Sequence, residues 1–141
     1  MRAGTDQSVH VIMKFFDDPS PEVRSAAAVG LGELEPECSA QFLSDVLNGS
    51  SRERRKKVAS AVVDSGLAAK AIDDLIHEDR HHVYNALCLL SLIVENGEVQ
   101  PLVSAIEEHP RTEVRGAALK LLLLSGNPEI ADSAVRRRLR I

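Results

Sequence analysis

A six-residue phrase, EVRSAA, begins at Glu22 and returns as EVRGAA at Glu113, a step of 91 in numbering (113 − 22). Aligning the apolar segments that lie between the two copies gives further equivalent positions, at Ala26, Val58, Ala86 and Ala117. The steps between their numbers are 32 (58 − 26), 28 (86 − 58) and 31 (117 − 86). A period of roughly 30 residues is typical of a solenoid, in which each repeat buries its apolar face against its neighbours.

Each period contains two segments with apolar residues at helical spacing. In the first segment, Val9, Ile12 and Phe16 share one face of a helix. The sequence DDPSP then ends that helix, because proline cannot continue it. We therefore predict an all-α, right-handed solenoid that forms a single domain over residues 1–141. The helix pairs are expected at about 5–35, 38–66, 67–97 and 98–126, with a terminal helix at 127–140.

The composition agrees with closely packed helices. The chain has three Phe, one Tyr and no Trp, which favours helix packing over a β-sandwich. Cys38 and Cys88 lack metal-ligand spacing and are typical of reduced thiols in a cytoplasmic protein. No signal-peptide pattern is visible, and no apolar run reaches the roughly 18–20 residues that span a bilayer. We expect a cytoplasmic protein without membrane insertion.

The segment DDPSPEVRSAAAVGLGEL, residues 17–34, combines an acidic turn, a proline, Val-Arg, small residues and Leu-Gly. This pattern resembles a HEAT-like repeat, in the short form named after phycobilisome lyases. The resemblance covers nearly the whole chain and is strongest in the first and fourth units. It implies a superhelix whose successive turns are linked by a ladder of polar side chains. The ladder residues would be structural: Asp18 with Arg24, and Glu108 with Arg115.

The sequence contains few candidates for catalysis. The stretch IHEDRHHVY, residues 76–84, gathers His and acidic residues that could bind a metal. An iron-binding hydroxylase of similar architecture uses His-Glu pairs at the start of second helices, and this chain lacks them there, so we interpret the stretch as a solvated turn. No motif places a nucleophile beside a base. We therefore predict no enzyme activity, no cofactor and no metal site.

The stretch RERRKK, residues 52–57, could bind phosphate or an acidic protein partner. The net charge of the chain is −4, and basic and acidic blocks alternate along it, so it lacks a uniformly basic surface. HEAT-like proteins that act on flipped bases use aromatic side chains, which are scarce here. We do not expect nucleic acid as the partner, and a solvated helix start is the simplest interpretation. The basic candidates are Arg52, Arg54, Arg55, Lys56 and Lys57.

In HEAT-like proteins the second helix of each pair lines the concave side. Helical spacing then places several apolar residues of the third and fourth units on that side. An exposed apolar patch usually marks an interface, although the C-terminal helix could also cover it. We predict a strip that binds a protein segment, formed by Asn85, Cys88, Leu92, Leu119 and Leu123.

These features favour a non-catalytic scaffold or adaptor that binds a protein segment on its concave face. Val11 and Phe15 lie off the core face of the first helix, so the partner could also be the remainder of a larger parent chain. The resemblance alone suggests one alternative, a bilin chromophore lyase or its accessory protein. The basic stretch suggests another, a nucleic-acid-binding HEAT-like protein. The oligomeric state stays open.

Overall fold

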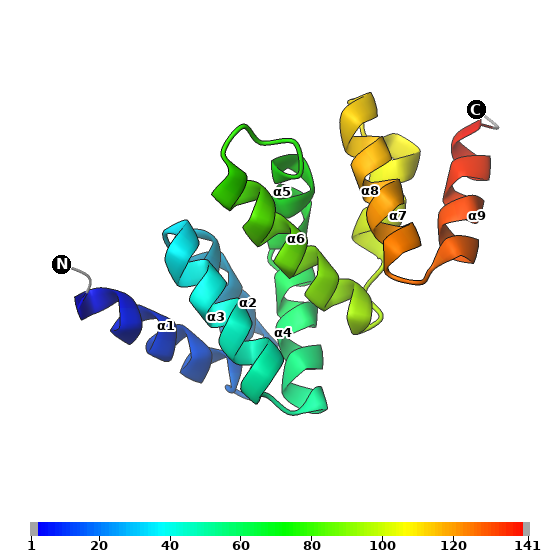
Figure 1. The fold of residues 1–141 in the computed structure, drawn as a ribbon. Coiled ribbons are helices and arrows are strands. Elements are labelled where there is room, and N and C mark those ends of the chain that lie inside the picture. The colour runs from blue at the N-terminus through cyan, green and yellow to red at the C-terminus, as the bar shows by residue number, and fades with distance from the viewer. Residues whose placement is uncertain (1–2, 140–141) are drawn as a thin grey trace.

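A computed structural model describes residues 3–139, together with the side chains from residue 10 onward except that of Pro36. These residues form nine α-helices and no strand (Figure 1). The helices are α1 (Ala3–Phe16), α2 (Pro21–Gly32), α3 (Pro36–Gly49), α4 (Arg52–Asp64), α5 (Leu67–Asp74), α6 (Arg80–Glu95), α7 (Gln100–Glu108), α8 (Thr112–Leu124) and α9 (Pro128–Leu139).

The helix starts follow from local capping chemistry. The hydroxyl of Ser20 accepts a hydrogen bond from the backbone N–H of Val23, and Pro21 occupies the first turn of α2. Ser51 caps α4 in the same way, through the N–H of Arg54 at 3.1 Å. These side chains satisfy backbone donors that have no partner within the helix. The sequence therefore determines locally where each of these helices begins.

The helices lie in two rows. One row is continuous, with α2 against α4, α4 against α5, α5 against α7 and α7 against α9 (Figure 1). In the other row, α1 packs on α3 and α3 packs on α6. The next member of that row is α8, but among the described helices α6 and α8 share no packed interface. The second row is therefore interrupted between α6 and α8.

This arrangement departs from the expected alternation of first and second helices. The predicted pairs α1–α2, α5–α6 and α7–α8 do pack against each other. By contrast, α3 packs mainly on α1 and α6, and α5 lies in the row of the second helices α2 and α4. The left-handed Gly66 (φ 85°) ends α4, and α5 begins at the next residue. As a result, α5 prolongs the row of α4, and α6 takes the place beside α3.

The structure also corrects the repeat register by one position in two units. Ala26 is exposed, whereas Ala27, Val58, Ala86 and Ala118 are all buried. Each of these four residues is the seventh of its helix. The steps between their numbers are therefore 31 (58 − 27), 28 (86 − 58) and 32 (118 − 86). Both copies of the repeated phrase end in two adjacent alanines, so the sequence alone was compatible with an alignment on either alanine.

A single hydrophobic core runs through the described helices, from Phe16 of α1 to Ala131 and Ala134 of α9. The rings of Phe16 and Phe42 lie 5.2 Å apart between α1 and α3. Most of the remaining core consists of Ala, Val and Leu, whose small volume allows the helix rows to approach closely. Its one buried polar side chain in this part of the chain is Ser39, which donates to the carbonyl of Leu31 at 3.2 Å.

Candidate interaction surface

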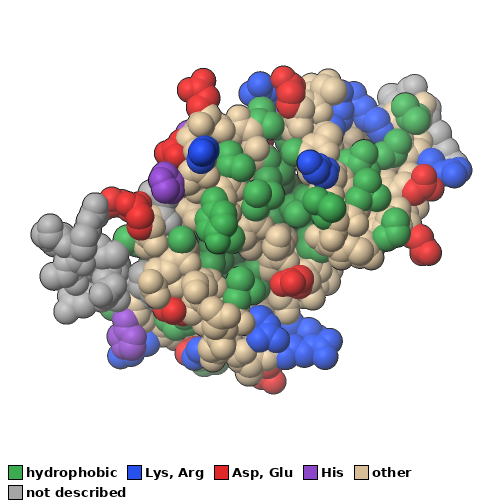
Figure 2. All heavy atoms as spheres, in the orientation of Figure 1, with side chains coloured by type: hydrophobic (Ala, Val, Ile, Leu, Met, Phe, Trp, Pro, Cys, Tyr) green, Lys and Arg blue, Asp and Glu red, His purple; other side chains and the backbone are tan. Residues whose placement is uncertain are grey.

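Helices α6 and α8 carry exposed apolar side chains on the same face of the molecule. Figure 2 shows hydrophobic side chains gathered over these two helices and in the space between them. Tyr84 is 61% exposed and Leu87 is 40% exposed on α6, and Leu123 and Leu124 are 50% and 76% exposed on α8. Water contact with so many large apolar groups is unfavourable, so a surface of this kind typically binds another molecule.

The predicted binding strip is only partly at the surface. Leu123 is exposed, and Cys88 and Leu119 are half-buried against the core. The prediction is wrong for Leu92, which is fully buried. Leu92 belongs to the buried side of α6, the helix that packs against α3, α4 and α5.

Asn85 has a different neighbourhood from the rest of the predicted strip. It borders a cavity of about 70 Å³ between α6 and the helices α2, α3 and α5. Leu89 of α6, Leu67 of α5 and Ser39 of α3 line the same cavity. Asn85 therefore faces the earlier units of the solenoid, on the opposite edge of α6 from the gap beside α8.

Cys88 and Tyr84 form a polar contact on the surface of α6. The Tyr84 hydroxyl hydrogen-bonds to Cys88, and this contact raises the pKa of the phenol. Burial raises the pKa of the Cys88 thiol. Both groups are therefore uncharged at neutral pH, and Cys88 lacks the thiolate character of a nucleophilic cysteine. Tyr84, Leu87 and the thiol together form an apolar surface with one hydroxyl group.

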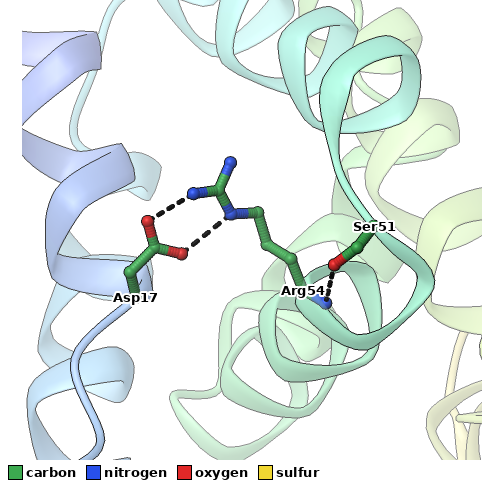
Figure 3. A network of polar contacts seen from close by, with 3 residues as sticks. All are labelled: Asp17, Ser51 and Arg54. Atoms are coloured by element: carbon green, nitrogen blue, oxygen red, sulfur yellow. Dashed lines mark hydrogen bonds and ion pairs between the residues drawn. The ribbon is translucent and has the colours of Figure 1, made fainter.

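The basic stretch at the start of α4 is divided between structural and free side chains. Arg54 binds the carboxylate of Asp17 with two nitrogens, with its Nε 2.8 Å from Oδ1, and so ties α4 to the end of α1 (Figure 3). Arg55 donates from Nη1 to the carbonyl of Ser50 at 2.7 Å. Arg52 and Lys56 are exposed and Lys57 is half-buried. Two of the five predicted basic residues thus hold the fold together.

Of the two expected ladder pairs, Arg24 does bind Asp18, but through the main chain, and Arg115 binds a residue other than Glu108. Arg24 donates to the main-chain carbonyl of Asp18 at 2.7 Å, and Arg115 donates to that of His109 at 2.6 Å, with no contact to Glu108. These arginines therefore fasten a helix to the turn of its own unit. The links between units include three pairs of ionisable side chains: Asp17 with Arg54, Asp73 with His109 at 2.7 Å, and Glu107 with Arg137 at 2.7 Å.

The histidine-rich stretch serves as the cap of α6. Asp79 accepts from the backbone N–H of His81 at 2.9 Å, and its other oxygen lies 3.0 Å from Nδ1 of His82. The backbone hydrogen bond is the main cause that lowers the pKa of Asp79. The rings of His77 and His82 stack at 4.2 Å. Among the side chains that the structure describes, from residue 10 to residue 139, no three of His, Cys, Asp or Glu are placed to hold a metal ion.

No single helix of the described chain is long and apolar enough to cross a membrane. The helices α6 and α7 reach the necessary length and apolarity only together, as a pair bent by 117°. Both helices contribute buried residues to the core.

Comparison with known proteins identifies the repeat. Residues 2–63 match the family described as HEAT repeats. This match covers α1 to α4, apart from the last residue of α4, and includes the first copy of the repeated phrase. No curated protein and no solved structure matches the chain.

Proposed function

We propose that the chain, whose residues 2–63 match HEAT repeats and whose helices form an all-α solenoid, is a non-catalytic scaffold or adaptor that binds a segment of a partner protein. HEAT repeats generally mediate protein–protein interaction. The observation that supports this function is the exposed apolar surface of α6 and α8, which the chain's own C-terminal helix leaves open. We call the exposed residues Tyr84, Leu87, Leu123 and Leu124, with the half-buried Cys88 and Leu119, the apolar surface.

The partner is a protein in the cytoplasm, either a separate chain or the remainder of a larger one. Cys38 and Cys88 are free thiols, in agreement with a reducing compartment. The positions of Arg54 and Arg55 in structural contacts leave Arg52, Lys56 and Lys57 for an acidic ligand. That reduced set favours a supporting role for the basic stretch over a nucleic-acid site.

The test compares partner capture by the protein and by two matched variants. Leu123→Glu places a charge on the apolar surface, and Val29→Glu places one on α2, where the native side chain is equally exposed (50% and 49%). Both variants should fold, because each native side chain is half in water. We expect mass spectrometry to find a protein retained by the wild type and by Val29→Glu and lost from Leu123→Glu. Equal retention by all three forms would contradict the assignment of this surface.

A further inference from the structure

The interruption between α6 and α8 has the character of a vacant helix position. In the same row, α3 packs against both α1 and α6. No described helix plays this part between α6 and α8, although α5 packs against both of them from the continuous row. Figure 2 shows hydrophobic side chains in the space between α6 and α8. The vacancy is thus bounded by helices on both sides and backed by α5.

Equivalent residues of α6 and α8 differ in the exposed fraction of their side chains. In the corrected register Ala86 matches Ala118, so Leu92 matches Leu124, since both pairs are separated by the same step (118 − 86 and 124 − 92). Leu92 is 0% exposed, whereas Leu124 is 76% exposed. Of these two equivalent leucines, the one in α6 is therefore covered and the one in α8 is open. The comparison concerns the leucines alone, because the corresponding residues of the first two units, Glu33 and Asp64, are exposed and acidic.

The positive charge of Lys120, beside Leu124, indicates a further property of a molecule that would bind here. Lys120 lies one turn before Leu124, so both side chains project from the same edge of α8. Lys120 is exposed, and it has no ion-pair partner among the described residues. On α6, Leu87 is apolar and 40% exposed, and helical spacing places it on a different side of that helix from Leu92. An occupant that covers this edge meets leucines on both sides and one cation.

We propose that the space between α6 and α8 binds an amphipathic helix of the partner protein, whose apolar face covers Leu87 and Leu124 and whose flank carries a carboxylate that pairs with Lys120. This inference rests on the proposed scaffold function and names the form of its ligand. The internal template is α3, which buries Cys38, Phe42, Leu43 and Val46 from one face of a helix of 14 residues.

Two synthetic helical peptides test this proposal. Both have leucine at the spacing of the buried residues of α3, and they differ only in carrying glutamate or lysine beside the apolar face. Fluorescence anisotropy with the full chain should show tighter binding of the glutamate peptide. Lys120→Glu should weaken binding of that peptide by about two- to fivefold, the upper part of the range for one exposed ion pair, and should strengthen binding of the lysine peptide. Leu124→Ser should weaken both peptides, and the control Val29→Ser should leave them unchanged.

Two outcomes would overturn the inference. If neither peptide binds at millimolar concentration, the occupant is not a helix of this chemistry, even if Leu123→Glu still abolishes capture of a partner from lysate. If both peptides bind and are insensitive to Lys120→Glu and Leu124→Ser, they bind elsewhere on the protein. If the peptides bind as expected but the wild-type protein captures no partner from lysate, the result would instead count against the wider scaffold function.

Discussion

The paired positions Leu92 and Leu124 allow a quantitative test of the two-row arrangement. Replacing a fully buried leucine by alanine removes apolar contacts and leaves a cavity, at a cost of about 2–5 kcal/mol. Leu92 is such a residue. Leu124 is 76% exposed, so about a quarter of the same transfer term is lost, or roughly 0.5 kcal/mol, and no cavity forms.

These costs correspond to well-separated melting temperatures. For 141 residues the entropy of unfolding is about 0.3 kcal/mol/K, so Leu92→Ala should lower the Tm by about 7–17 °C and Leu124→Ala by about 2 °C. Circular dichroism during thermal and urea unfolding measures both variants, and agreement between the two denaturants checks that unfolding is cooperative. Equal losses in the two variants would refute the reasoning, because they would mean that Leu124 is covered in solution as Leu92 is.

Three further predictions concern turns, caps and links between units. Gly66→Ala should destabilise the protein by about 1–2 kcal/mol because φ is 85° there, whereas Gly49→Ala, inside α3 with open space around the added methyl group, should be neutral or stabilising in urea titrations. The pKa of Asp79 is lowered in the folded state, so the stability that this carboxylate contributes is present above its unfolded pKa of about 3.9 and is lost as the pH falls through the folded pKa. The difference in unfolding free energy between the wild type and Asp79→Ala should therefore shrink on acidification from pH 7 to pH 2. A difference that stays constant would argue against the cap. A double-mutant cycle on Asp17 and Arg54 should give a coupling energy of about 0.5 kcal/mol, and this energy should decrease in high salt because both side chains are partly exposed. A coupling energy that salt leaves unchanged would contradict an ion pair screened by solvent.

Much of the fold could be predicted because its signals are local. The helix starts at Pro21 and Arg52 follow from the preceding serine caps, and the repeated phrase indicates a solenoid from residue spacing alone. The match of residues 2–63 to HEAT repeats and the all-α architecture confirm that prediction.

The arrangement of the rows could not be predicted, because it depends on contacts between distant segments. Leu92 and Cys88 lie one turn apart on α6, and only the packing of neighbouring helices decides that the first is fully buried. Leu87 and Lys120 were missed for the same reason. With the register of α8 corrected to Ala118, the helical spacing would have indicated Lys120 as an edge residue of that helix. The register of α6 at Ala86 needed no correction, so it does not account for the omission of Leu87.

The ladder illustrates a different limit of sequence patterns. Arginine at the fourth position of α2, α4 and α8 is a recurrent feature, but the partner of each guanidinium is a backbone carbonyl that no sequence letter specifies. The third unit has Val83 at that position. There the Asp79 cap and the histidine stack organise the turn instead.

The unequal rows also give the molecule a preferred direction of bending. From α2 to α9 one row transmits force through successive helix interfaces, so stretching it would separate packed surfaces. The other row has a slot between α6 and α8, where widening or narrowing separates no packed pair. The protein should therefore resist deformation along the continuous row of helices and yield more easily on the side of the interrupted row. A load applied to its two ends changes the width of the slot before it disturbs the core.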